Sequence, residues 1–198
     1  MHAAGLAATP DAGLAGQRLR TVAIVVVTAL AIAVAAWFIN QPTADGLTEV
    51  TIAAGPGAPP QVGEAPPAFS ATDVDGAEVS LSDYAGQPVW LTFGASWCAD
   101  CRAESPDLQA TYARYAAQGL VVLGVFIEED DAAVREYADR LGFTFPMIAD
   151  PQDRIAGAYH LLGIPTHYFI GPDGRVEQVR LGGLHADEMD RLVQGLLD

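Results

Sequence analysis

The sequence predicts an α/β domain with a mixed central sheet between helices, preceded by one membrane-spanning helix. Three observations predict this class. An uncharged apolar run occupies residues 21–39, apolar strand-like runs alternate with helical segments over residues 88–159, and the chain closes with two strand-like runs and a helix. Strands that alternate with helices are typical of α/β sandwiches.

Length, charge and cysteine count restrict the possible functions. The chain has 198 residues, and its 10 basic residues, all arginine, face 25 acidic ones, for a formal net charge of −15. Such an acidic excess repels a phosphate backbone, which excludes non-specific nucleic-acid binding. The chain has two cysteines, so it can build neither a framework of several disulfides nor a zinc site with four thiolates.

Residues 21–39 are expected to form an uncleaved membrane anchor. At about 1.5 Å rise per residue, the run nearly matches the roughly 30 Å hydrocarbon core of a bilayer. Arginines in residues 1–20 precede it and acidic residues follow it, so the positive-inside bias leaves the N-terminus in the cytoplasm and the rest of the chain outside. A cleaved signal peptide is the alternative, because residues 33–35 resemble a cleavage site, but the apolar run continues beyond them.

A linker and a globular domain are expected after the anchor. Residues 40–65 are rich in proline and glycine, which is typical of a tether. The globular domain then covers residues 66–198. It opens with a hairpin, because residues 69–72 and 78–81 are short alternating runs on either side of an Asp-Gly pair.

The remaining elements follow from apolar periodicity. The strands are predicted at residues 88–93, 120–127, 145–148, 166–171 and 175–181. The helices are predicted at residues 98–118, 130–141, 152–159 and 186–197. Both cysteines therefore lie where the first of these strands passes into the first of these helices.

Cys98 and Cys101 are spaced i and i+3 at this predicted helix start. Their sulfurs lie one helical turn apart and can join without unwinding the helix. Free backbone N–H groups and the helix dipole favour a thiolate at Cys98, whereas Cys101 is more shielded, so we predict that Cys98 attacks and Cys101 resolves. The alternatives are an inert structural disulfide, whose short loop gains little chain entropy, and half of a metal site.

The motifs around these cysteines carry a family resemblance. The stretch TFGASWCADCRAESPDLQ, followed by GIPTHYFIGPDGRV, resembles the thioredoxin superfamily, and the hairpin with FPMIADP resembles its TlpA/ResA-like, membrane-tethered branch. The resemblance covers residues 66–198 and implies a thioredoxin fold with an N-terminal β-hairpin extension and an αβ insertion. It also implies extracytoplasmic thiol-disulfide exchange without a bound cofactor. Family substrates are the haem-site cysteines of apocytochrome c or copper-site proteins, with a membrane thiol-disulfide transporter as electron donor.

The resemblance also implies a substrate-binding loop. Pro165 matches the family's cis-proline, whose loop faces the dithiol and holds a substrate strand through backbone hydrogen bonds; an X-Pro bond adopts the cis state more readily than other peptide bonds. Ile164 and Thr166 flank this proline. Trp97 matches the tryptophan beside the reactive sulfur, although a tryptophan there could equally fill the core.

Proton transfer requires a further residue, because Cys101 must lose its proton to resolve the mixed disulfide. Cytoplasmic thioredoxins use a buried aspartate in the preceding strand, where this chain has Thr92. The resemblance points instead to Glu104 and to an acid after the second strand of the domain's sheet, which is Glu129 or, with a shift of one residue, Glu128. A partly buried carboxylate can exchange a proton near neutral pH. The alternative is that these are solvated surface acids.

Three positions depart from the family pattern. Asp100 replaces a common proline before the second cysteine, and its carboxylate disfavours a neighbouring thiolate, which favours a reductant. Gly94 replaces an aromatic residue, so we expect open space near the sulfurs. His167 replaces a small residue, and a histidine in a strand is typically packed or exposed, although this one could approach the sulfurs.

Two other functions compete with disulfide reduction. In a copper-delivery module, Cys98, Cys101 and His167 would bind Cu(I) as soft ligands. The related Sco-type copper chaperones separate their cysteines by three residues, and this chain separates them by two. A peroxidase would need a Thr/Ser-x-x-Cys motif with a preceding proline, which the sequence lacks. The sequence therefore favours a thiol-disulfide oxidoreductase without a metal.

Overall fold

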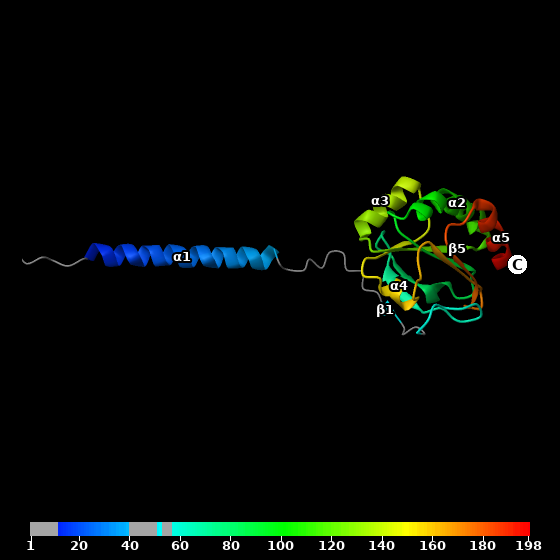
Figure 1. Cartoon of the computed structure of the whole chain (residues 1–198), viewed down its shortest axis with the longest axis horizontal. Helices are drawn as coiled ribbons and strands as arrows, with labels where there is room; N and C mark the ends of the chain where they lie inside the picture. The colour runs from blue at the N-terminus through cyan, green and yellow to red at the C-terminus, as the bar shows by residue number, and fades with distance from the viewer. Residues whose placement is uncertain (1–11, 40–50, 53–56) are drawn as a thin grey trace, which may run out of the picture. The chain divides into compact units, whose positions relative to one another are not determined.

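The computed structural model describes residues 12–39, 51–52 and 57–198 (Figure 1). The chain divides into two compact units, Met1–Asp45 and Gly46–Asp198. Most of the predicted N-terminal segment, and the predicted linker over residues 40–50 and 53–56, lie outside the described residues.

The first unit contains one long helix, α1 (Ala12–Ile39). Its segment Arg20–Trp37 has a mean hydropathy of 2.1 and is long and apolar enough to cross a membrane. The hydroxyl of Thr28 donates to the carbonyl of Ile24 (2.8 Å), so this polar side chain is satisfied within the helix, as the bilayer interior demands. Length, composition and position near the N-terminus suggest a single-pass membrane anchor, and the helix begins earlier than the predicted residue 21.

A five-stranded mixed sheet forms the centre of the second unit, with the order β6-β5-β4-β7-β8. β5 runs parallel to β4 and β6, whereas β7 runs antiparallel to β4 and β8. β4, β6 and β7 are buried along their whole length, as expected of strands covered on both faces. The strands are β4 (Val89–Gly94), β5 (Val121–Ile127), β6 (Met147–Asp150), β7 (Thr166–Ile170) and β8 (Val176–Leu181).

Helices cover one face of this sheet, and a small β-layer with a short helix covers the other. Side chains alternate along β4, so that Trp90 packs on the first face and Leu91 on the second. The first face carries α2 (Ala99–Tyr115), α3 (Asp131–Leu141) and α5 (Ala186–Leu197), and the second carries α4 (Arg154–Ala158) (Figure 1). Two 3-10 turns, η1 (Leu81–Tyr84) and η2 (Ala116–Gln118), complete the set.

The β-layer contains the predicted hairpin. β2 (Phe69–Thr72) pairs antiparallel with β3 (Glu78–Ser80), and Gly76 provides the positive φ of 87° that their turn requires. β1 (Thr51–Ile52) adds a third strand beside β2. The backbone at residues 63–64 also exchanges hydrogen bonds with Val176, so parts of the predicted linker belong to the folded unit.

The order of elements confirms the predicted α/β class. β4, α2 and β5 are followed by α3 and β6, which form the αβ insertion, and then by α4, β7, β8 and α5. β6 begins two residues later than predicted, because Pro146 has no N–H for the ladder while Phe145 is already buried in the core. The helix predicted over residues 186–197 has the predicted bounds.

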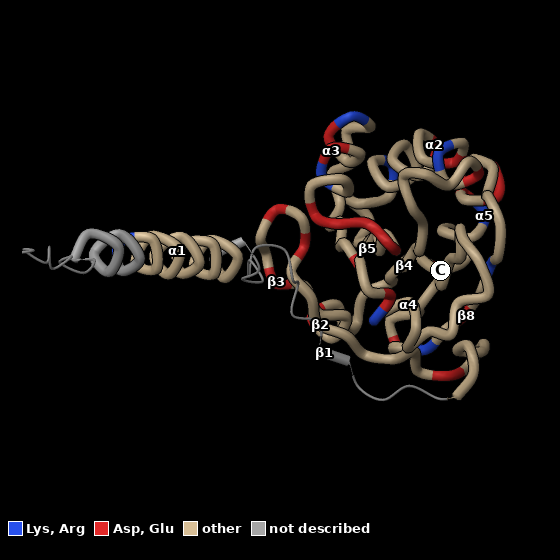
Figure 2. The backbone as a smooth tube through the Cα atoms, turned by 60° about the vertical axis from the view of Figure 1, so that its left-hand side comes forward, with Lys and Arg blue, Asp and Glu red and all other residues tan. Residues whose placement is uncertain are grey.

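The acidic excess is distributed over the second unit. Figure 2 shows Asp and Glu on α3, on α5 and on the β2–β3 hairpin, so they are not confined to one patch. One buried acid is structural. Asp150 accepts hydrogen bonds from three backbone N–H groups at the start of α4, and burial raises its pKa even though these hydrogen bonds act in the opposite direction.

Candidate active site

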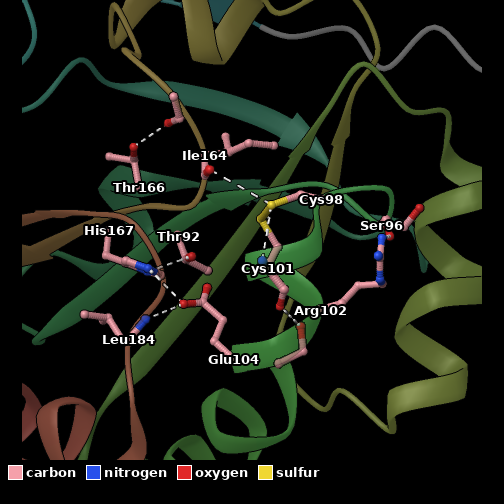
Figure 3. Close-up of a disulfide and its surroundings, with 12 residues drawn as sticks. Thr92, Ser96, Cys98, Cys101, Arg102, Glu104, Ile164, Thr166, His167 and Leu184 are labelled. Atoms are coloured by element: carbon pink, nitrogen blue, oxygen red, sulfur yellow. Dashed lines mark hydrogen bonds and ion pairs between the residues drawn. A yellow bond between two sulfur atoms is a disulfide. The ribbon is translucent and has the colours of Figure 1, made fainter.

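Cys98 and Cys101 form a disulfide at the junction of β4 and α2, with their Cα atoms 5.3 Å apart (Figure 3). Cys98 is the N-cap of α2 and has extended backbone, and its Sγ accepts the N–H of Cys101 at 3.2 Å. The same N–H and the positive end of the helix dipole would stabilise a Cys98 thiolate after reduction. The local structure therefore suits reversible chemistry with Cys98 as the attacking sulfur.

The second sulfur is enclosed more completely than the first. Cys101 is 3% exposed, against 8% for Cys98. A Cβ placed on Gly94 would lie 3.4 Å from the sulfur of Cys101 and 3.3 Å from a ring carbon of Phe126. The expectation of open space at Gly94 is therefore wrong, because this sulfur and this ring already occupy it.

The loop before β7 lies against the disulfide. The Ile164–Pro165 peptide bond is cis, as the family resemblance implied. The carbonyl oxygen of Ile164 is 4.0 Å from the Sγ of Cys98, and the Ile164 side chain packs against the small cluster that contains the two cysteines. Thr166 is buried, and its hydroxyl donates to the carbonyl of Gly163 (2.6 Å), so this side chain closes the loop from inside.

Trp97 lies at the surface, directly before Cys98 in the chain. Its side chain is 53% exposed, so it does not fill the core. Leu162 and Leu181 are also exposed, and the Cδ1 of Leu181 approaches the cis-proline loop, at 3.7 Å from a Cβ placed on Gly163. The reactive edge therefore offers apolar side chains to a partner molecule.

Glu104 lies on α2, the helix that also contains Cys101. It is 5% exposed, so it is not a solvated surface acid. Its Oε2 accepts the N–H of Leu184 at 2.8 Å and lies 3.4 Å from the Nε2 of His167 (Figure 3). A hollow in the surface borders Glu104 and is lined in addition by Asp100, Ala103, Asp107, Gly183, Leu184 and His185.

The structure distinguishes the two acids that follow β5. Glu128 is exposed with a φ of 56°, whereas Glu129 is 9% exposed and turns inward. The carboxylate of Glu129 accepts the backbone N–H of Ser96 at 2.7 Å and also the hydroxyl of Ser96. Arg102 donates to the carbonyl of the same serine at 3.1 Å. Glu129 therefore holds the loop that precedes Cys98.

His167 is packed, as expected of a histidine in a strand, but its contacts were not indicated by the sequence. It is fully buried, and its Nδ1 lies 3.3 Å from the indole nitrogen of Trp90 and 3.0 Å from the hydroxyl of Thr92. These contacts depend on the register between β4 and β7, in which Thr92 pairs with His167. Paired residues of adjacent strands share one face of a sheet, so the two side chains meet. Sequence periodicity alone does not supply this register.

The same geometry bears on the copper hypothesis. The imidazole nitrogens of His167 face Trp90, Thr92 and Glu104. Within the described part of the chain, no group of three or more His, Cys, Asp or Glu side chains could hold a metal ion. The structure therefore does not bring His167 together with the two cysteines as a ligand set.

Tyr137 of α3 contacts α2 next to Glu104. The hydroxyl of Tyr137 is 2.9 Å from the Oγ of Ser105, the residue after Glu104. Burial raises the pKa of Tyr137, so its phenol stays protonated near neutral pH. The ring also packs against Phe126, with ring centroids 5.3 Å apart.

The chain is similar to known thiol-disulfide oxidoreductases. Residues 62–179 match the AhpC/TSA family. The thiol-disulfide oxidoreductase ResA of Geobacillus kaustophilus is 36% identical over 135 residues, which cover 68% of this chain and 78% of that protein. ResA of Oceanobacillus iheyensis is 34% identical over 134 residues, covering 66% and 70% of the two chains.

Solved structures give the same answer for the fold. A thiol:disulfide interchange protein of the thioredoxin family from Chlorobium tepidum TLS has a TM-score of 0.64 and 28% identity, covering 71% of this chain and all of that one. A DsbE-type thiol:disulfide interchange protein from Chlorobium tepidum has a TM-score of 0.65 and 27% identity, covering 70% and 99%. The chain thus belongs to the AhpC/TSA family and, within it, to the ResA-like thiol-disulfide oxidoreductases with a thioredoxin fold.

Proposed function

We propose that this protein reduces disulfides of other proteins on the outer side of the membrane, held there by α1 with its N-terminus in the cytoplasm. The haem-site cysteines of apocytochrome c or cysteines of copper-site proteins are the substrates, and a membrane thiol-disulfide transporter returns electrons to the CxxC pair. One observation carries the proposal. The redox-active Cys98–Cys101 disulfide lies at the start of α2, with the buried carboxylate of Glu104 one turn further along the same helix.

The reaction proceeds in two exchanges. The Cys98 thiolate attacks one sulfur of the substrate disulfide, which forms a mixed disulfide and releases the first substrate thiolate. Cys101 then gives its proton to Glu104, and its thiolate attacks the Sγ of Cys98. The mixed disulfide breaks, the Cys98–Cys101 disulfide forms, and the second substrate thiolate leaves. In total, two electrons pass from the dithiol to the substrate, Glu104 returns the Cys101 proton to solvent, and the two released thiolates take up their protons from solvent.

Substrate recognition uses the exposed edge of the site. The cis-proline loop offers backbone groups to a substrate strand, as main-chain pairing at a strand edge does in other peptide-binding sites. Ile164 lies against the sulfur of Cys98, and Trp97 covers the neighbouring surface. In this proposal Pro165 fixes the course of the loop, and Thr166 supports it from inside through its bond to Gly163.

The negative charge of Asp100 favours electron flow from this protein to its substrate. Asp100 is exposed between the two cysteines. Its carboxylate disfavours the reduced thiolate beside it, and a less stable thiolate accompanies a more reducing couple. Glu129 contributes through the loop that it holds rather than by direct proton transfer.

The reduction potential of the CxxC pair tests the direction. We would equilibrate the full chain in detergent micelles against defined thiol buffers. A potential at or below roughly −250 mV, in the thioredoxin range, supports a reductant, whereas one near about −120 mV, in the DsbA range, means an oxidant. Asp100→Asn is the matched variant, and it should shift the potential in the oxidising direction.

The topology has its own test. A membrane-impermeant thiol reagent, applied to intact cells after reduction, should label Cys98 in the Cys101→Ser variant. Labelling only after the cells are opened would place the domain on the cytoplasmic side and overturn this part of the proposal.

A further inference from the structure

We infer that His167 is a positioning residue for the thiol-disulfide reaction. Its imidazole is fixed as the tautomer with hydrogen on Nε2, and this N–H holds the Glu104 carboxylate that takes the Cys101 proton. The inference rests on the proposed role of Glu104 as proton acceptor.

The partners of Nδ1 fix the tautomer. The indole nitrogen of Trp90 can only donate, and its N–H points to the Nδ1 of His167 at 3.3 Å. A ring nitrogen that accepts this hydrogen cannot carry one itself. The hydroxyl of Thr92, 3.0 Å from the same nitrogen, must then donate as well. A neutral imidazole in this place therefore has its hydrogen on Nε2.

That hydrogen faces Glu104. The distance from Nε2 to Oε2 is 3.4 Å, and both side chains are buried (Figure 3). Among the described residues, Nε2 has no hydrogen-bond partner of standard geometry. A buried N–H without a partner is costly, so its interaction with the carboxylate is the interaction that the site provides for it. Hydrogen bonds of catalytic groups are commonly long at rest and shorten during the reaction.

The two oxygens of Glu104 therefore differ. Oε2 receives both the Leu184 N–H and the approach of His167. Oε1 is left to take a proton. Donors on Oε2 stabilise the ionised carboxylate and keep it oriented whether or not Oε1 carries the proton.

Other ionisable groups also surround Glu104. Asp100 and Asp107 face it from α2, and His185 faces it from the segment before α5, across the surface hollow. Tyr137 on α3 is coupled to it electrostatically. A pH profile of the reaction contains all of these groups, so only a change caused by His167 itself identifies its role.

Two substitutions at position 167 separate the contacts of the imidazole. His167→Asn places an amide near Nδ1, so it can accept from Trp90 and Thr92 but cannot reach Glu104. His167→Gln places an N–H near Nε2 and so preserves the donor to Glu104. Both remove the ring, which makes each a control for loss of packing in the other.

The measurement is the pH dependence of insulin-disulfide reduction by the full chain in detergent. For His167→Asn we expect a rate about tenfold lower at pH 7 and a rising limb moved up by about one pH unit, because a hydrogen bond to a charged group is lost. His167→Gln should stay within about threefold of the parent and keep its profile. Equal effects of the two variants on rate, with an unmoved profile, would mean a packing role and overturn the inference.

The Glu104→Gln background distinguishes this inference from the proposed function. If Glu104→Gln leaves rate and profile unchanged, the proposed role of Glu104 fails. If it changes them but His167→Asn moves the profile just as much in that background as in the parent, His167 does not act through Glu104. We expect no further shift there.

A second variant serves in case His167→Asn does not fold. Trp90→Phe removes the N–H that fixes the tautomer and keeps an aromatic ring against Phe169, whose centroid lies 5.1 Å from that of Trp90. The rising limb should move in the same direction by a smaller amount, and an unmoved limb would contradict the assignment.

Discussion

Two buried carboxylates flank the CxxC loop, and they differ in what their oxygens do. Glu104 receives both of its described contacts on Oε2, from Leu184 and His167. Glu129 uses both oxygens on one residue, Ser96. Burial and hydrogen bonding are therefore shared by the two acids and do not identify a proton acceptor.

The positions of these acids relative to the two sulfurs complete the contrast. Glu104 lies on α2 one turn beyond Cys101, the sulfur that must lose a proton. Glu129 holds the loop before Cys98, the sulfur that meets the substrate. We propose that the first acid serves the chemistry of resolution and the second serves the placement of Cys98. The predictions below test this division.

Glu104→Gln should have the largest effect. Loss of a general base typically costs about a hundredfold or more in rate, so we expect insulin reduction to fall by that amount and the contribution of Glu104 to the rising limb of the pH profile to be lost. The mixed disulfide through Cys98 should accumulate and be visible on a non-reducing gel. The matched control is the exposed Glu128→Gln, which should behave like the parent. A near-normal rate for Glu104→Gln would show that another group accepts the proton.

Glu129→Gln should mainly affect stability. Its carboxylate makes charge-assisted hydrogen bonds to Ser96, and losing them should lower the free energy of unfolding by about 2 kcal/mol. We expect a rate reduced by about threefold to fivefold with the pH profile in place. Urea unfolding and the insulin assay measure the two effects. A displaced pH profile would assign Glu129 to proton transfer and remove the contrast with Glu104.

Much of the fold could be predicted because its signals are local. Asp-Gly marked the hairpin turn, and the apolar spacing of α5 gave both of its ends. The cysteine pair and the cis-proline belong to short motifs, so they were also found. Glu104 was indicated by the family resemblance, and the structure buries its side chain.

The features that the sequence did not predict depend on backbone geometry and on contacts between residues far apart in the chain. The contact of His167 with Glu104 requires the pairing of β4 with β7. The choice between Glu128 and Glu129 depends on the left-handed backbone at Glu128, and glutamate does not mark such a position. The space at Gly94 is occupied by side chains from α2 and β5, which a pattern within β4 cannot reveal.

Ser96→Ala should have the smallest effect, and it tests a single hydrogen bond of Glu129. It removes only the hydroxyl that bonds to Glu129, while the backbone N–H of residue 96 remains. We expect a loss of about 1 kcal/mol in the free energy of unfolding and a rate within about twofold of the parent. In the Glu129→Gln background the loss should be smaller, since the two changes remove the same interaction. Fully additive losses would show that the Ser96 hydroxyl stabilises the loop without Glu129, and would leave the backbone N–H of Ser96 as the bond through which this acid holds the loop.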